Sequence, residues 1–108
     1  MDKHAIVVAD AHGVIQLWSA GAAALFGHPA GAAIGRKLDL IVPEQLRTAH
    51  WAGFGHAMSA GSANGEGTFF NLPVLCRDGE TKEFRGQLHL LRDENRQAIG
   101  AMAIFTSA

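Results

Sequence analysis

The 108-residue chain contains one cysteine, no tyrosine and three prolines. A single cysteine excludes an internal disulfide framework and any zinc site built from several thiolates. No sign of charge dominates, because nine basic residues face ten acidic ones and the formal net charge is −1. A nearly neutral chain lacks the basic surface that nucleic acid or an anionic membrane requires, so neither is an expected partner.

Long apolar runs are also missing. No stretch is long enough to cross a bilayer, and the first residues do not resemble a signal peptide. We therefore expect a cytoplasmic protein. Hydrophobic residues nevertheless make up 48% of the chain and charged residues only 18%. This composition supports a packed core, and the length predicts a single domain over residues 1–108.

The first half of the chain predicts a hairpin followed by helices. Short β-branched runs at residues 5–9 and 14–18 flank a turn at residues 10–13. Ser19 is a suitable N-cap for a short helix over residues 20–26, which Gly27 would end. A second short helical segment is expected at residues 29–35. Pro43 suits the first turn of a longer helix that reaches about residue 60.

The second half of the chain predicts three strands, at residues 68–76, 83–91 and 98–106. A polar, glycine-rich loop at residues 61–67 precedes the first of them. Pro73 cannot donate a backbone hydrogen bond, so this strand is expected either to lie at an edge of the sheet or to contain a bulge. The predicted fold class is α+β, with a five-stranded antiparallel sheet and helices packed on one face.

His50 is the most informative single residue. It lies on a helical stripe with Leu46, Phe54, Ala57 and Met58, on a face that should be buried. One interpretation is a core histidine that is hydrogen-bonded to backbone carbonyls. The other is the axial ligand of haem iron, which needs only one protein nitrogen because the porphyrin supplies four. The pattern alone leaves both interpretations open.

Other chemistry finds little support. His50 and His56 are six residues apart and lie on different helix faces, so a site with several histidine ligands is disfavoured. Cys76 is expected to act as a small hydrophobic residue in a strand. The carboxylates form no recognisable acid–base pair, and an enzyme is therefore not the first expectation.

Three short motifs in order resemble the PAS domain family: DAHGVI at residues 10–15, LFGH at residues 25–28 and IGR at residues 34–36. The stretch LIVPEQLRTAH at residues 40–50 resembles haem-binding PAS domains of bacterial gas sensors. These include the oxygen-sensing histidine kinases of nitrogen-fixing bacteria and oxygen-regulated cyclic-di-nucleotide phosphodiesterases. In them, the histidine at the position of His50 is the proximal haem ligand.

The resemblance implies a PAS fold that binds haem b, with His50 as the metal ligand. It departs from the oxygen sensors on the distal side, where their arginine and methionine fall on Phe70 and Thr68. An apolar distal side lacks a charged donor, so we expect weaker oxygen binding than in sensors with the arginine. The expected cofactor-binding residues are Leu40, Ile41, Leu46, His50, Phe54, His56, Met58, Thr68, Phe70, Leu72, Gly86 and Leu88.

Three functions remain from the sequence. The first is a haem-binding PAS sensor of oxygen, carbon monoxide, nitric oxide or redox state, with a homodimer or a separate signalling protein as partner. The second is a haem-free PAS module for dimerisation or protein interaction. The third is a haem enzyme with peroxidase-like or nitrogen-oxide chemistry, for which no distal histidine–arginine pair is visible.

Overall fold

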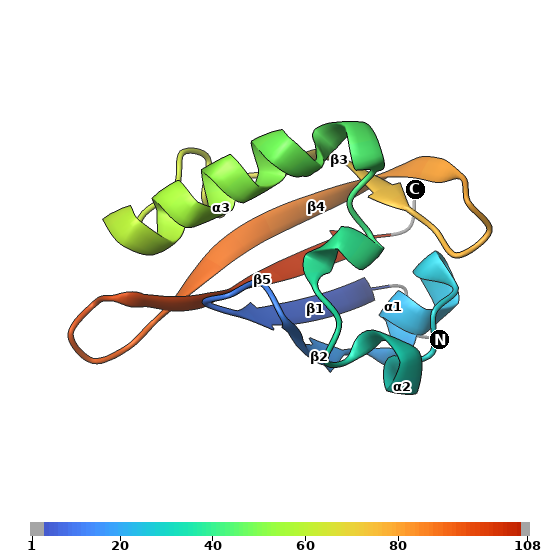
Figure 1. Cartoon of the computed structure of the whole chain (residues 1–108), viewed down its shortest axis with the longest axis horizontal. Coiled ribbons are helices and arrows are strands. Elements are labelled where there is room, and N and C mark those ends of the chain that lie inside the picture. The colour runs from blue at the N-terminus through green and yellow to red at the C-terminus, as the bar shows by residue number, and fades with distance from the viewer. Residues whose placement is uncertain (1–3, 107–108) are drawn as a thin grey trace.

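The computed structural model describes residues 4–106, which form one five-stranded antiparallel sheet with its helices between the second and third strands (Figure 1). The strand order is β2-β1-β5-β4-β3. This confirms the predicted α+β class. In chain order the elements are β1 (His4–Asp10), β2 (Ile15–Trp18), α1 (Ala20–Phe26), α2 (Ala30–Ala33), the 3₁₀ turns η1 (Leu38–Leu40) and η2 (Glu44–Leu46), α3 (Arg47–Ala60), β3 (Phe70–Leu75), β4 (Thr81–Arg92) and β5 (Ala98–Thr106).

Local signals set the bounds of α1. The Ser19 hydroxyl accepts a hydrogen bond from the Ala22 amide at 3.1 Å, as an N-cap does, and a second from the Ile6 amide of β1 at 2.8 Å. Gly27 ends the helix in the left-handed region, at φ 95°. The predicted helix over residues 20–26 is therefore confirmed at both ends, and its cap also joins it to the sheet.

The predicted long helix is divided into two parts. Residues 44–46 form the 3₁₀ turn η2, with the Leu46 amide bonded to the Pro43 carbonyl, and the α-helix begins only at Arg47. The Arg47 guanidinium donates back to the carbonyls of Val42 and Asp39 at 3.2 Å each. The start of α3 is thus tied to the segment that precedes it.

Strand β3 lies at an edge of the sheet, the first of the two alternatives expected from Pro73. It begins at Phe70 and not at Thr68, because Thr68 is held in a turn: its amide and hydroxyl both donate to the Gly65 carbonyl. The last strand, β5, has the predicted bounds of residues 98–106.

Alternate residues of β1, β4 and β5 face the helices and fall into matched rows. Val7 and Leu88 both pair with Ala103, and Ala9 and Leu90 both pair with Ala101. The next row, beyond Ala103, has Phe105 at its centre. The two ends of this inner face are consequently lined by side chains of very different size.

The dense core lies at the α1 end of the sheet. Phe26 is 1% exposed, and its ring makes edge-to-face contacts with Phe84, Phe105 and Trp18 at centroid distances of 5.2, 5.1 and 5.7 Å. Val74 of β3 is buried in the same cluster. Aromatic packing of this kind anchors α1 against the sheet.

Helix α3 packs loosely by comparison. Of its residues only Ala57 is buried, while His50, Phe54 and Met58 are half-buried. Leu46, one turn before His50, is 39% exposed. The expectation of a buried stripe is therefore wrong for most of its members, because the helix faces small side chains across an open space. No helix among residues 4–106 is long and apolar enough to span a bilayer.

Candidate functional site

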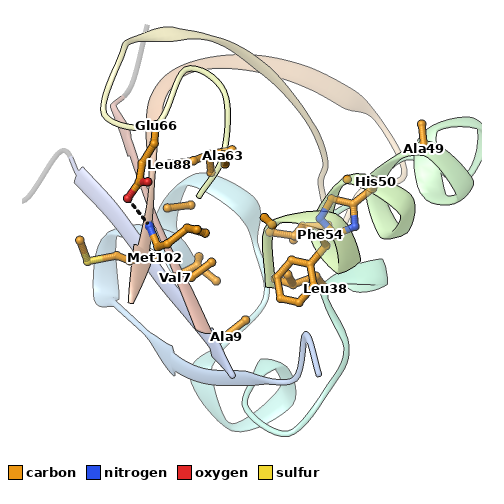
Figure 2. A pocket seen from close by; sticks show the side chains of 16 residues that line it. Val7, Ala9, Leu38, Ala49, His50, Phe54, Ala63, Glu66, Leu88 and Met102 are labelled. Carbon is orange, nitrogen blue, oxygen red and sulfur yellow. Dashed lines mark hydrogen bonds between the residues drawn. The ribbon is translucent and has the colours of Figure 1, made fainter. Parts of the chain in front are cut away.

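A cavity of about 300 Å³ separates α3 from the sheet (Figure 2). Helix α3 forms one side of it, and β1, β4 and β5 form the other. The loop between α3 and β3 and the segment around η1 complete the wall. The lining residues are Val7, Ala9, Leu38, Ile41, Ala49, His50, Gly53, Phe54, Ala57, Ala63, Glu66, Leu88, Leu90, Ala101, Met102 and Ala103.

Small side chains on both sides create this space. The inward positions of β1 and β5 are occupied by Ala9, Ala101 and Ala103. The facing side of α3 carries Gly53 and Ala57. Protein interiors otherwise pack closely, so a void of this size beside a dense core is a feature of the sequence and not of loose folding. It falls at the lower end of the range of small-molecule sites, about 300–1,000 Å³.

His50 supplies an unusual polar atom to this apolar wall. Its side chain is half-buried, and its Nδ1 atom is buried without a hydrogen-bond partner in the described part of the chain. Burial lowers the pKa of His50, and the nearby Asp39 carboxylate opposes this shift. The imidazole is therefore neutral at pH 7 and presents a lone pair, the form that binds a metal.

Two aromatic rings hold the imidazole in place. The Phe54 ring lies 6.0 Å from the His50 ring at an interplanar angle of 32°, and the Trp51 ring lies 4.8 Å away at 76°. In Figure 2, His50 and Phe54 project from α3 at one side of the cavity, and Glu66 lies at the other. The cavity wall therefore has a neutral base at one side and a carboxylate at the other.

The Glu66 carboxylate is fully engaged. It accepts two hydrogen bonds from the Arg92 guanidinium, at 2.6 and 3.0 Å, and one from the Leu90 amide at 2.9 Å. The Arg92 hydrogen bonds lower the pKa of Glu66 to about 2. Arg92 Nε also donates to the Gly61 carbonyl at 3.0 Å, so one arginine fastens both ends of the loop at residues 61–66 to β4.

The structure brings together four of the twelve expected cofactor-binding residues: Ile41, His50, Phe54 and Leu88 line the cavity. The other eight lie outside its wall. Leu40, Met58 and Leu72 are half-buried elsewhere, and Leu46, His56, Thr68 and Phe70 are exposed.

Gly86, the eighth, is buried in β4. Its lack of a side chain leaves no gap on the apolar face, because neighbouring groups fill the space. A Cβ at this position would come within 3.0 Å of Leu72 Cδ1 and 3.2 Å of Phe105 Cδ1. Phe70 and Thr68, the two positions expected on the distal side, do not line the cavity.

Apart from Leu88, sequence reasoning missed the sheet side of the cavity, and it also missed Glu66. The alanines of β1 and β5 carry no chemical signal, although their small size within otherwise apolar strands is visible in the sequence. Within residues 4–106, no group of three or more histidine, cysteine or acidic side chains is arranged to hold a metal ion. Cys76 is buried, and burial raises the pKa of its thiol.

Comparison with known proteins agrees with this architecture. The chain is 44% identical over 46 residues to the Sensor protein FixL of Bradyrhizobium diazoefficiens, a match that covers 43% of this chain and 9% of that protein. The PAS domain of a protein from Colwellia psychrerythraea superimposes with a TM-score of 0.82 at 23% identity, covering 99% of this chain and 87% of that one.

A second solved structure, the RpfR quorum-sensing receptor PAS domain of Cronobacter turicensis in complex with C12:0, gives a TM-score of 0.74 at 17% identity. It covers 99% of this chain and 95% of that one. At these identities the solved structures establish the fold alone. A family profile described as the PAS fold matches residues 3–108, nearly the whole chain, and the protein therefore belongs to the PAS family.

Proposed function

We propose that this PAS sensor domain binds haem b in the cavity beneath α3, with His50 as the iron ligand, and senses a diatomic gas or redox state. The observation that carries the proposal is the buried Nδ1 atom of His50, which has no hydrogen-bond partner among the described residues. A buried polar atom without a partner costs about 1–3 kcal/mol, so such a group needs an explanation. A cofactor whose metal has an open coordination position for the imidazole would explain it.

The surroundings of His50 suit a flat, apolar cofactor. Burial favours the neutral imidazole, and Gly53, one turn along α3, leaves open space where a side chain would stand. Phe54 presents a ring beside the imidazole for contact with a macrocycle. The iron of such a group would supply reversible binding of a diatomic gas or an electron.

A macrocycle needs more room than the enclosed cavity, and apolar side chains exposed beside it offer the additional surface. Leu88 lines the cavity and is 39% exposed. Phe70 pairs with Gly86, two residues before Leu88 on β4, and is 38% exposed. Leu46 precedes His50 by one helical turn and is 39% exposed. Covering these three side chains would stabilise the complex.

The remaining wall indicates which ligands the site would favour. No arginine or lysine is among the residues that line the cavity, and its one carboxylate, Glu66, is ionised. Such a wall offers an anionic ligand no favourable electrostatic contact. We therefore expect neutral carbon monoxide to bind more tightly than oxygen, whose bound form profits from a cationic donor.

The test is the absorption spectrum of the full chain titrated with haemin. We expect a Soret band at one haem per chain, and His50→Ala should abolish or shift it. His56→Ala is the matched control, because His56 lies exposed on the same helix and its removal should leave the spectrum unchanged. A wild-type chain that binds no haem, or a spectrum that survives His50→Ala, would overturn the proposal.

A haem-free interaction module is the second candidate, and one observation favours it. The outward face of the sheet is apolar at its centre, where Ile6, Val8 and Ile104 occupy outward positions, and Leu17 beside them is 46% exposed. Sedimentation of the wild type against Leu17→Lys separates the candidates. A colourless dimer that Leu17→Lys dissociates would favour this function over haem sensing.

A further inference from the structure

Trp51 directly follows His50 in α3, and three groups outside the helix hold its indole. The indole Nε1–H donates to Asp39 Oδ1 at 2.6 Å. The Lys37 ammonium lies 5.6 Å from the centre of the ring, within the range of a cation–π contact. The far edge of the ring lies against the backbone of Gly13. Trp51 therefore connects α3 to two segments that are distant from it in sequence.

The contact with Gly13 leaves no room for a side chain. A Cβ at Gly13 would lie 2.2 Å from Cη2 and 2.3 Å from Cζ3 of Trp51, far inside van der Waals contact. Gly13 also has φ 79°, a conformation that favours glycine. The turn between β1 and β2 is thus shaped to accept this indole.

That turn is itself firmly held. The Gly13 carbonyl accepts a hydrogen bond from the Leu38 amide at 2.9 Å, and Val14 pairs with Lys37 as an isolated β-bridge. The Asp10 carboxylate accepts from the amides of His12 and Val14. Because this turn follows β1, which pairs with the central strand β5, the contacts of Trp51 lead to the centre of the sheet.

We propose that Trp51 is the positioning residue for His50, and that it transmits any displacement of His50 to the turn at Gly13. The two rings are in edge-to-face contact at 4.8 Å, and adjacent residues of a helix move together when the helix rotates. A rotation of α3 that moves His50 pulls the indole away from Asp39 and Gly13. The importance of His50 rests on the proposed function, but these contacts exist without a cofactor.

The experiment measures coupling in the full chain without added haem, by ¹H–¹⁵N NMR. The readout is the change that His50→Ala produces in the chemical shift of the Gly13 amide. It is measured in the wild type, in Trp51→Leu and in Trp18→Phe. The last is the matched control, because Trp18 also donates its indole N–H, to the His28 carbonyl at 2.8 Å, but belongs to the core at the α1 end.

We expect His50→Ala to shift the Gly13 amide in the wild type and equally in Trp18→Phe, and to shift it far less in Trp51→Leu. Hydrogen exchange of the Leu38 amide, which bonds to Gly13, should rise about tenfold in Trp51→Leu as the turn loosens. Trp51→Phe, which keeps an aromatic ring beside His50 but loses the hydrogen bond to Asp39 and the outer edge of the indole, should fall between the two and remains informative if Trp51→Leu unfolds.

A Gly13 response that is as large in Trp51→Leu and Trp51→Phe as in the wild type would overturn the proposal. Its failure is distinguishable from that of the proposed function. Absence of a Soret band with intact coupling would reject haem and retain the positioning role. A normal Soret band without coupling would do the reverse.

Discussion

The two ends of one sheet face are built in opposite ways. At the α1 end, the Phe26 ring contacts Phe105 of β5 and Phe84 of β4, and all three rings are at most 8% exposed. Two and four residues earlier on the same strand, Ala103 and Ala101 face a cavity of about 300 Å³. A single strand thus passes from dense packing to open space, and the difference separates the part that stabilises the fold from the part that is free to bind.

The most severe test of this division is removal of an aromatic side chain from the dense end. Phe26→Ala should lower the free energy of unfolding by about 3–5 kcal/mol, because it loses buried area and leaves a new void. Leu90→Ala, at the cavity end, should cost less than half as much, since Leu90 is only half-buried and already borders open space. Urea unfolding measures both. Equal losses would show that the two ends contribute alike.

Adding volume should again cost more stability at the dense end than at the cavity end. Ala101→Leu places a larger side chain in the cavity and should change stability by less than about 1 kcal/mol, while abolishing haem binding. Ala22→Leu, at a fully buried position in α1, should cost about 1–3 kcal/mol through overpacking. Thermal unfolding and haemin titration measure the two effects. A strongly destabilised Ala101→Leu would mean that the cavity closes in solution.

The dense end is also the part that the sequence predicts best. Ser19, Gly27 and Pro73 each act through their own backbone or cap, and the cap of α1, its end and the edge position of β3 were all predicted from them. Such signals are local, so they can be recognised in the sequence without knowledge of the tertiary structure.

The cavity end was predicted less well. His50 and Phe54 were identified from helical spacing and from the resemblance to haem-binding PAS domains, and both line the cavity. That spacing assumes a helix in contact with a core, and it fails for Leu46 because α3 is separated from the sheet. Glu66 and Arg92 are separated by 26 positions in the sequence, so no local pattern predicts that they pair.

Two ion pairs at opposite ends of β4 sharpen the comparison on a smaller scale. Arg92 holds Glu66 and Gly61 beside the cavity, whereas Lys82 holds only the exposed Asp78 at 3.3 Å. Arg92→Gln should therefore lower the melting temperature and speed the exchange of an apolar fluorescent probe with the cavity. Lys82→Gln should do neither, because exposed pairs contribute little. If the two variants behave identically, Arg92 does not anchor the loop.

The smallest expected effect is the loss, at low pH, of the stability that the Glu66–Arg92 pair contributes. In the folded protein Arg92 holds the pKa of Glu66 at about 2, against an ordinary value of 4.5. A carboxyl group with a lowered pKa stabilises the fold above its ordinary pKa, and this contribution is lost as the pH falls toward the lowered value. The difference in stability between the wild type and Glu66→Gln should therefore be constant above about pH 5 and shrink steadily between pH 4.5 and 2.

Urea unfolding across this range measures the difference, with Asp78→Asn as the control for the exposed pair. A difference that persists unchanged at pH 2 would show that Glu66 holds the loop through its shape and not through its charge.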